Sequence, residues 1–140
     1  MRVMLDTNCI DSLLADGEAF SALINRKDIR LLLTTIQFEE LQAVPDAQRR
    51  QELLDIANSL CSRLSTSNAE QKFPEDSGKH AHDKIILEAS LGCDLFVSND
   101  TGLLELAISE RKRAVPWGVF VEKYIFSSKK NKMVINKQKR

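Results

Sequence analysis

Short hydrophobic runs alternate along the chain with longer amphipathic stretches. The runs at 2–5, 29–33 and 95–98 have the length of strands, and the second of them is aliphatic apart from one arginine. Such runs are typical of strands that are buried on both faces of a sheet. A further short run at 114–117 predicts an edge strand, because Pro116 has no N–H group to donate to a neighbouring strand.

The stretches between these runs carry apolar residues at the three- and four-residue spacing of helices. Thr34 and Gln37 match a capping box, which predicts that a helix begins there and ends before Pro45. Residues 65–79 are polar and predict a loop. The other predicted helices are 9–24, with an interruption at Asp16-Gly17, then 46–64, 80–91, 103–108 and 119–126.

Strands that alternate with helices predict an α/β fold, a three-layer α/β/α sandwich with a mainly parallel central sheet. A length of 140 residues fits one domain. Residues 127–140 hold six basic residues and no acid, so the zero net charge of the chain leaves residues 1–126 with 14 basic and 20 acidic residues. We therefore expect one domain at 1–126, followed by a basic tail at 127–140.

The composition also indicates the compartment. The longest stretches without a charged residue have eight residues, at 31–38 and 114–121, whereas a membrane-spanning helix needs about 20. Asp6 interrupts the region where an export signal would be apolar. The three cysteines are odd in number and form no disulfide framework, which favours a reducing cytoplasm.

Four acidic residues follow successive elements of the predicted fold. Asp6 and Asp100 come directly after strands, and in open α/β sheets ligands bind beyond the carboxyl ends of the strands. Asp83 lies near the start of the apolar helix. Glu40 lies beside the apolar stripe of its helix, whereas Glu39 points away from that stripe. Clustered carboxylates require neutralising cations, and oxygen ligands suit Mg²⁺ or Mn²⁺, which activate water and stabilise phosphoryl transition states.

Each acid also has an interpretation without catalysis. Asp6 and Asp100 occupy positions where an aspartate caps a helix, and Asp83 lies at the positive end of a helix. On this interpretation the chain is a non-catalytic RNA- or protein-binding module. The two interpretations differ in whether the four carboxylates converge on one pocket.

The ordered set of motifs resembles the PIN-domain nucleases, and within them the VapC-like toxins of toxin–antitoxin pairs. It consists of Asp6-Thr7-Asn8 after a strand, Glu40-Leu41 in a helix, the segment from Asp83 to Ala89, and Phe96 to Asp100. The resemblance covers roughly residues 1–126. It implies a metal-dependent endoribonuclease with Asp6, Glu40, Asp83 and Asp100 as catalytic and metal-binding residues.

The resemblance also implies supporting residues and partners. Thr7, Asn8 and Ser98 would support the acids by hydrogen bonds, and an antitoxin would be the cognate protein partner. A homodimer is left open by the sequence. Leu103 stands where many members of the family have a further acid, which argues against a strongly bound second metal. Cations placed to hold the RNA backbone are Lys79, Lys84, Lys129, Lys130 and Lys132.

Other constellations carry less weight. His80 and His82 form only part of a zinc motif, since the chain has no third histidine. Asn8 stands where aspartyl phosphatases have their second aspartate, which removes the expected general acid. Cys9 is interpreted as a buried thiol, because no basic residue lies beside it in the sequence.

Overall fold

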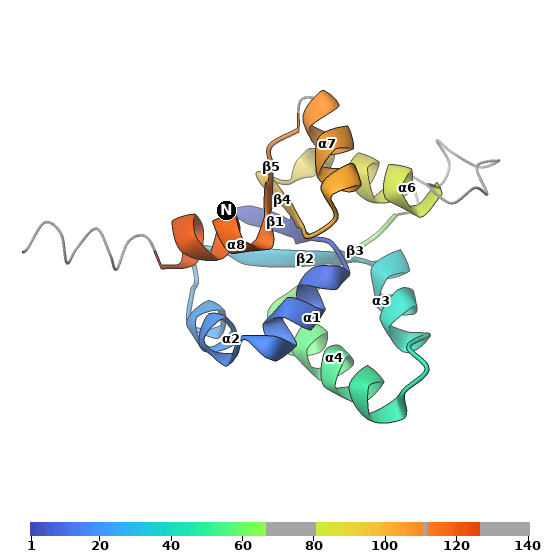
Figure 1. The fold of residues 1–140 in the computed structure, drawn as a ribbon, viewed down its shortest axis with the longest axis vertical. Coiled ribbons are helices and arrows are strands. Elements are labelled where there is room, and N and C mark those ends of the chain that lie inside the picture. The colour runs from blue at the N-terminus through green and yellow to red at the C-terminus, as the bar shows by residue number, and fades with distance from the viewer. Residues whose placement is uncertain (67–80, 111, 127–140) are drawn as a thin grey trace, which may run out of the picture.

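Five parallel strands form the central sheet in this computed structural model, which describes residues 1–66, 81–110 and 112–126 (Figure 1). Side chains 81–83 also lie outside the described part. The strands are β1 (Arg2–Leu5), β2 (Arg30–Thr34), β3 (Cys61–Leu64), β4 (Leu95–Ser98) and β5 (Ala114–Pro116), in the order β3-β2-β1-β4-β5. All five strands have their carboxyl ends at the same edge of the sheet, which we call the carboxyl edge. Because β1 is the middle strand, its end lies at the centre of the carboxyl edge.

The helices connect these strands, as expected for a parallel sheet. Each predicted strand and helix has a counterpart in the described residues. The helices are α1 (Asn8–Ala15), α2 (Gly17–Ile24), α3 (Thr35–Gln42), α4 (Ala47–Leu60), α6 (Ala81–Ala89), α7 (Thr101–Ser109) and α8 (Trp117–Phe120), with a 3₁₀ turn at Ser90–Gly92 and a π-helical turn at Val121–Ile125.

Alternate side chains of the strands face two different hydrophobic layers. Val3 and Leu5 of β1 belong to the larger layer, which includes residues of α1, α2, α3, α4 and α8. Met4 belongs to the smaller layer, which includes residues of α6 and α7. Figure 1 shows α1, α2, α3 and α4 on one side of the sheet and α6 and α7 on the other. The predicted three-layer α/β/α sandwich is therefore confirmed.

The prediction of one helix over 46–64 is wrong at its end. Helix α4 stops at Leu60, and Cys61–Leu64 form β3, which pairs with β2 as an outermost strand of the sheet. Leu60 and Leu64 are four residues apart, so their spacing continues the helical pattern. The middle of β3 is exposed, and the guanidinium of Arg63 lies 4.2 Å from the centroid of the Phe38 ring. A short, half-polar edge strand has no apolar run that would reveal it in the sequence.

The predicted helix start at Thr34 is confirmed in detail. The Thr34 hydroxyl accepts a hydrogen bond from the backbone N–H of Gln37, and the Gln37 side chain accepts one from the backbone N–H of Thr34. This capping box fixes the first turn of α3 directly beyond the end of β2. It thereby places Glu40 one turn further along the same helix.

Two predicted segments fall largely or wholly outside the described residues. They are the 65–79 loop, of which only residues 65 and 66 are described, and the 127–140 tail. Across the described residues, every helix is too short or too polar to cross a membrane.

Candidate functional site at the carboxyl edge of the sheet

Asp6 follows β1 at the centre of the sheet edge, and its side chain is buried, with 9% exposed. One carboxylate oxygen, Oδ1, accepts a hydrogen bond of 2.8 Å from the backbone N–H of Thr7. The other, Oδ2, accepts one of 2.7 Å from the hydroxyl of Ser98. The backbone N–H of Asp6 donates to the carbonyl of Val97. Residue 7 occupies the N-cap position of α1, so Asp6 is not its cap.

Ser98 connects Asp6 with Asp100. Its side chain is fully buried at the end of β4, and its hydroxyl accepts a 2.9 Å hydrogen bond from the backbone N–H of Asp100 while it donates to Asp6. Asp100 itself is exposed, and its Oδ1 accepts a 3.2 Å bond from the N–H of Leu103. Asp100 is therefore the N-cap of α7, as the interpretation without catalysis expects.

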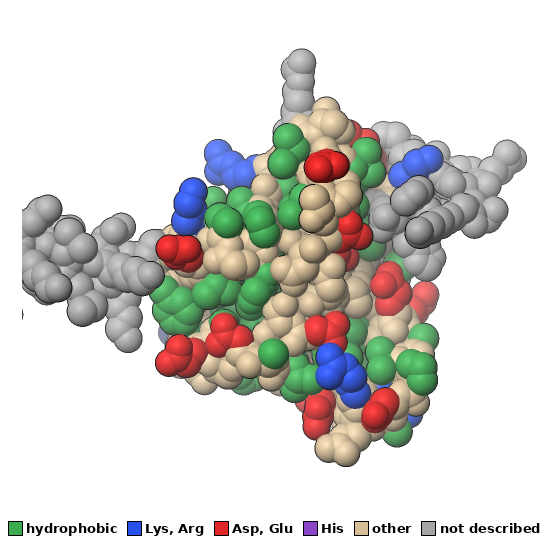
Figure 2. All heavy atoms as spheres, viewed as in Figure 1, with side chains coloured by type: hydrophobic (Ala, Val, Ile, Leu, Met, Phe, Trp, Pro, Cys, Tyr) green, Lys and Arg blue, Asp and Glu red, His purple; other side chains and the backbone are tan. Residues whose placement is uncertain are grey.

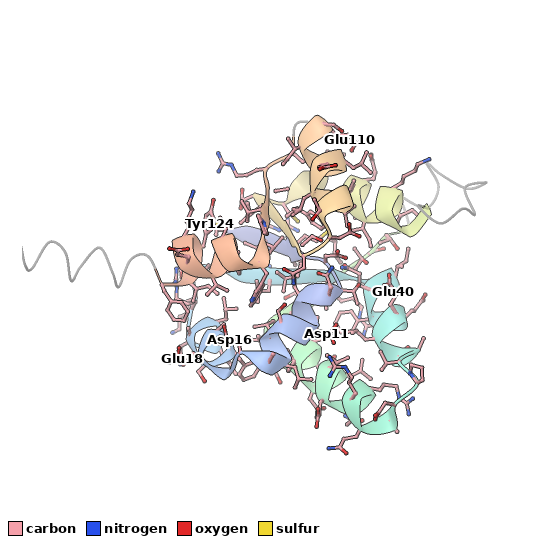
Figure 3. All side chains as sticks on the ribbon, viewed as in Figure 1. Asp11, Asp16, Glu18, Glu40, Glu110 and Tyr124 are labelled. Atoms are coloured by element: carbon pink, nitrogen blue, oxygen red, sulfur yellow. The ribbon has the colours of Figure 1, made fainter. Side chains whose placement is uncertain are left out.

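Thr7 connects Asp6 with Glu40. While its N–H donates to Asp6, its hydroxyl donates a 3.2 Å hydrogen bond to Oε2 of Glu40. Figure 3 shows Glu40 on α3. Glu40 is half-buried and Glu39 is exposed, so the predicted difference in exposure between the two glutamates is confirmed. Hydrogen bonds through Thr7 and Ser98 thus link the carboxylates of Asp6 and Glu40 with the backbone of Asp100.

Asn8 supports the same edge through the backbone. Its Oδ1 accepts a 3.2 Å hydrogen bond from the N–H of Asn99, and the side chain of Asn99 donates a 2.9 Å bond to the hydroxyl of Ser12 on α1. These bonds hold the turn between β4 and α7 against α1. The sequence singles out Asn8, whereas Asn99 and Ser12 have no pattern that distinguishes them from other polar loop and helix residues.

The backbone of α6 brings the fourth acid into the same region. Ile36 of α3 and Ile85 of α6 form a small buried cluster of their own, so these two helices meet near the edge. Asp83 lies two residues before Ile85, in the first turn of α6, and its side chain is outside the described residues. Among the side chains that the structure describes, no three His, Cys, Asp or Glu residues stand close enough to hold a metal ion.

The donor set fits a hard divalent cation in its chemistry. Asp6, Glu40 and Asp100 offer only oxygen, and Asp6 is oriented by a hydrogen bond to each oxygen. Mg²⁺ and Mn²⁺ prefer such ligands. The described acids alone do not complete a site, so the fit depends on Asp83. Figure 2 shows acidic side chains scattered over the face in view, with Lys, Arg and hydrophobic side chains between them.

The predicted RNA-contacting cations are described only in part. Lys84 is exposed on α6, in the turn that carries Asp83. Lys79 and the tail lysines 129, 130 and 132 lie outside the described residues, as does His80 and the side chain of His82.

Cys9 lies under the site as a buried thiol, as predicted. Its Sγ is 3.4 Å from the carbonyl of Val97. Burial raises the pKa of the Cys9 thiol far above its usual value, and the charge of Asp6 raises it further. Because the thiolate is the nucleophilic form of cysteine, Cys9 is unsuited to covalent catalysis.

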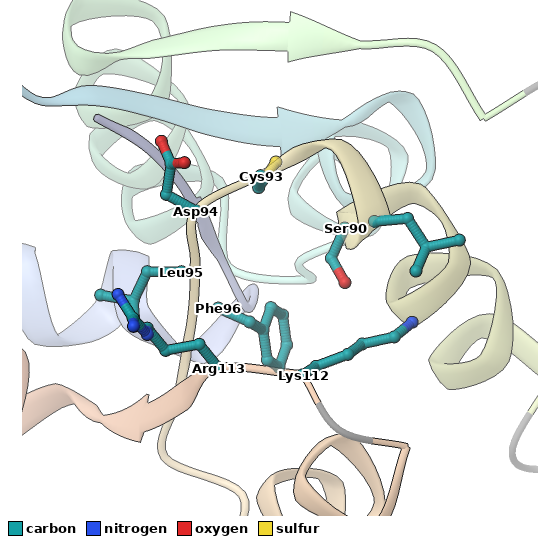
Figure 4. A pocket seen from close by; sticks show the side chains of 8 residues that line it. Ser90, Cys93, Asp94, Leu95, Phe96, Lys112 and Arg113 are labelled. Carbon is teal, nitrogen blue, oxygen red and sulfur yellow. The ribbon is translucent and has the colours of Figure 1, made fainter.

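A separate pocket lies at the opposite edge of the sheet, where β4 begins (Figure 4). It has a volume of about 200 Å³. Its one acid, Asp94, accepts a hydrogen bond from the backbone N–H of Arg2, and the ammonium of Lys112 donates to the carbonyl of Leu87 at the end of α6. The first contact joins β1 to the start of β4 and the second joins the segment before β5 to α6, which gives Asp94 and Lys112 structural roles.

Comparison with solved structures supports the architecture. A chain in the crystal structure of VapBC2 from Rickettsia felis, bound to a DNA fragment from their promoter, superposes with a TM-score of 0.58. The match covers 84% of this chain and 99% of that chain at 14% sequence identity, and likeness at that identity shows the fold alone. No protein-family model matches the sequence, and no curated protein matches it.

Proposed function

We propose that the protein is a divalent-metal-dependent endoribonuclease that hydrolyses RNA phosphodiester bonds. The observation that supports this proposal is the set of hydrogen bonds that joins the carboxylates of Glu40 and Asp6 through Thr7, and the carboxylate of Asp6 to the backbone N–H of Asp100 through Ser98. A helix cap needs no such connection, because a cap satisfies only the N–H groups of its own helix. The fold likeness to a chain of VapBC2 supports the same proposal.

The proposed ligands of the cation are Asp6, Glu40, Asp83 and Asp100. When bound, Mg²⁺ or Mn²⁺ supplies Lewis acidity that stabilises the negative charge developing on the phosphate. The protein groups around it fix the ligands: Ser98 and the N–H of Thr7 hold both oxygens of Asp6, and the Thr7 hydroxyl holds Glu40. Exposed Lys84 and the basic tail would hold the RNA backbone, which predicts binding that weakens with salt.

The proposed setting is a toxin–antitoxin pair in the cytoplasm. The similar solved structure is a VapBC2 complex on promoter DNA. By analogy, we propose that this chain is the toxin and that a cognate antitoxin covers the acidic edge of the sheet. The division into a nuclease domain at 1–126 and a basic tail at 127–140 belongs to the same proposal.

Cleavage of RNA by Asp6→Asn protein tests the function directly. The wild type should cleave in Mg²⁺ or Mn²⁺ and not in EDTA, and Asp6→Asn should lose most of that activity because an amide is a poorer ligand. Asp55→Asn is the matched control, since Asp55 is exposed on α4 and accepts a hydrogen bond from Gln51 of the same helix. Cleavage by folded Asp6→Asn protein at the wild-type rate would refute the assignment.

One observation favours the non-catalytic binding module as a second candidate. Asp100 is exposed and caps α7, so its position after β4 is explained without a metal-binding role. Thermal melts of the wild type and of Asp100→Asn distinguish the two functions. A metal site predicts that Mn²⁺ raises the melting temperature of the wild type more than that of the variant. If metal shifts neither protein and the variant is less stable in EDTA, the module replaces the nuclease.

A further inference from the structure

Gln37 is a fully buried polar side chain at the same edge of the sheet as the acids. It lies on α3, one turn before Glu40. Burial of an amide is costly unless its polar atoms have partners. Both ends of the Gln37 carboxamide are used, and the two partners belong to different strands.

The carboxamide of Gln37 bridges β2 and β1. Its Oε1 accepts a 2.8 Å hydrogen bond from the backbone N–H of Thr34, at the end of β2. Its Nε2 donates a 2.6 Å bond to the carbonyl oxygen of Leu5, at the end of β1. The side-chain amide thus extends the hydrogen bonding between these strands past their last paired residues.

Only one of these two bonds belongs to the helix cap. A capping box needs an acceptor at the position of Gln37, and glutamate supplies it as well as glutamine does. The bond to Leu5 needs a donor, which the carboxylate of glutamate lacks. Glutamine can therefore make both bonds, whereas glutamate can make only the bond of the helix cap.

The bond to Leu5 acts on the peptide group that precedes Asp6. The carbonyl of this peptide is held by Gln37 and its N–H by the carbonyl of Val97. Gln37 and Glu40 lie one turn apart on α3. The bond from Gln37 to Leu5 therefore also links the helix that carries Glu40 to the backbone at Asp6. A fixed backbone and a fixed carboxylate together set where Asp6 stands relative to Glu40.

We propose that Gln37 is a positioning residue, which sets the separation of Asp6 and Glu40 for a divalent cation. This inference rests on the proposed nuclease function. Residues that orient metal ligands without touching the metal typically change metal affinity by about 10- to 100-fold.

Two variants separate the bond to Leu5 from the helix cap. Gln37→Glu keeps the acceptor for the cap and removes the donor, and Gln37→Met removes both in a side chain of similar length. We expect each to weaken Mg²⁺ affinity about tenfold, measured by titration of backbone amide NMR signals, and to lower kcat with an unchanged KM for RNA. The matched controls are Gln42→Glu and Gln42→Met, because Gln42 is exposed on the same helix.

A third control separates positioning from loss of stability. Ser90→Ala removes a buried hydroxyl that donates to the carbonyl of Leu87, near the opposite edge. It should lower the melting temperature and leave Mg²⁺ affinity within twofold of the wild type. If Ser90→Ala weakens Mg²⁺ binding as much as the Gln37 variants do, Gln37 acts through stability and the proposal is overturned.

A measurement on the wild type does not depend on any variant folding. The side-chain amide signals of Gln37 should shift during Mg²⁺ titration with the same apparent Kd as the backbone amide of Asp6. Unshifted Gln37 signals, or folded Gln37 variants with wild-type affinity and kcat, would overturn the positioning role alone. A folded wild type that neither binds Mg²⁺ nor cleaves RNA would overturn the proposed function, and the positioning role with it.

Discussion

Substitution of Ser98 by alanine tests the connection between Asp6 and Asp100. The hydroxyl of Ser98 donates to a buried carboxylate and accepts from a backbone N–H, at 2.7 and 2.9 Å. A hydrogen bond to a charged group contributes about 1.5–3 kcal/mol, and a neutral one about 0.5–1.5 kcal/mol. Because Asp100 is exposed, water replaces much of the second bond. Ser98→Ala should therefore lower the free energy of unfolding by about 2–3 kcal/mol.

Thermal and urea denaturation measure this loss. Unfolding entropies of about 2.1 cal/mol/K per residue give about 0.3 kcal/mol/K for a chain of this length, so the melting temperature should fall by about 7–10 °C. The matched control is Ser109→Ala. Ser109 is exposed on α7 and donates to the carbonyl of Leu106 within its own helix. We expect this control to change the free energy of unfolding by less than about 0.5 kcal/mol.

A double-mutant cycle shows whether the effect passes through Asp6. Asp6→Asn removes the charge of the acceptor and Ser98→Ala removes the donor of one bond, so their effects on the free energy of unfolding should differ from additivity by about 1–2 kcal/mol. Asp6→Asn and Ser109→Ala should be additive within about 0.5 kcal/mol. Additivity of the first pair, or a Ser98→Ala protein as stable as Ser109→Ala, would refute the reasoning.

Four further predictions concern Glu40, the cysteines and the basic tail. Glu40→Gln should reduce cleavage far more than Glu39→Gln, measured at saturating Mn²⁺, and equal rates would remove Glu40 from the site. Half-buried Cys93 should react with iodoacetamide before Cys9. Because burial raises the pKa of the Cys9 thiol in the folded protein, its contribution to stability is present below the unfolded-state pKa of about 8.5 and is lost as pH rises above it. Between pH 7 and 10, the free energy of unfolding should therefore decline less steeply in Cys9→Ala than in the wild type, as measured by denaturation. Deletion of 127–140 removes six cations and should flatten the salt dependence of RNA affinity, which filter binding at several salt concentrations measures.

Local signals in the sequence account for most of the fold. The apolar run of β4 and the capping box at Thr34 each depend on a few adjacent residues, and both are present as predicted. The break between α1 and α2 also follows from local chemistry, because Asp16 accepts a hydrogen bond from the N–H of Ala19 and caps α2. Where neighbouring residues decide the conformation, the sequence is sufficient.

The features that the sequence does not reveal depend on distant partners. Strand β3 exists because Cys61 pairs with Leu31, 30 positions earlier, and nothing in its own four residues requires a strand. The capping role of Gln37 is visible in the sequence, but its bond to Leu5 is not, since that contact exists only after β1 and β2 have paired. The site itself was predicted as an ordered set of acids, and the hydroxyl bridges that join them appear only in three dimensions.

The central place of β1 also sets the order in which the protein can assemble on the ribosome. Strands β1, β2 and β3 are all present once residue 64 has been made, but Val3 pairs with Leu95 on the other side. The hydroxyl that holds Asp6 is 92 residues away along the chain. At synthesis rates of about 5–20 residues per second, Asp6 waits roughly 5–18 seconds for Ser98. A nascent chain interrupted before β4 therefore carries Asp6 without the bond that orients it, and the activity proposed for this edge can arise only after Ser98 has been added.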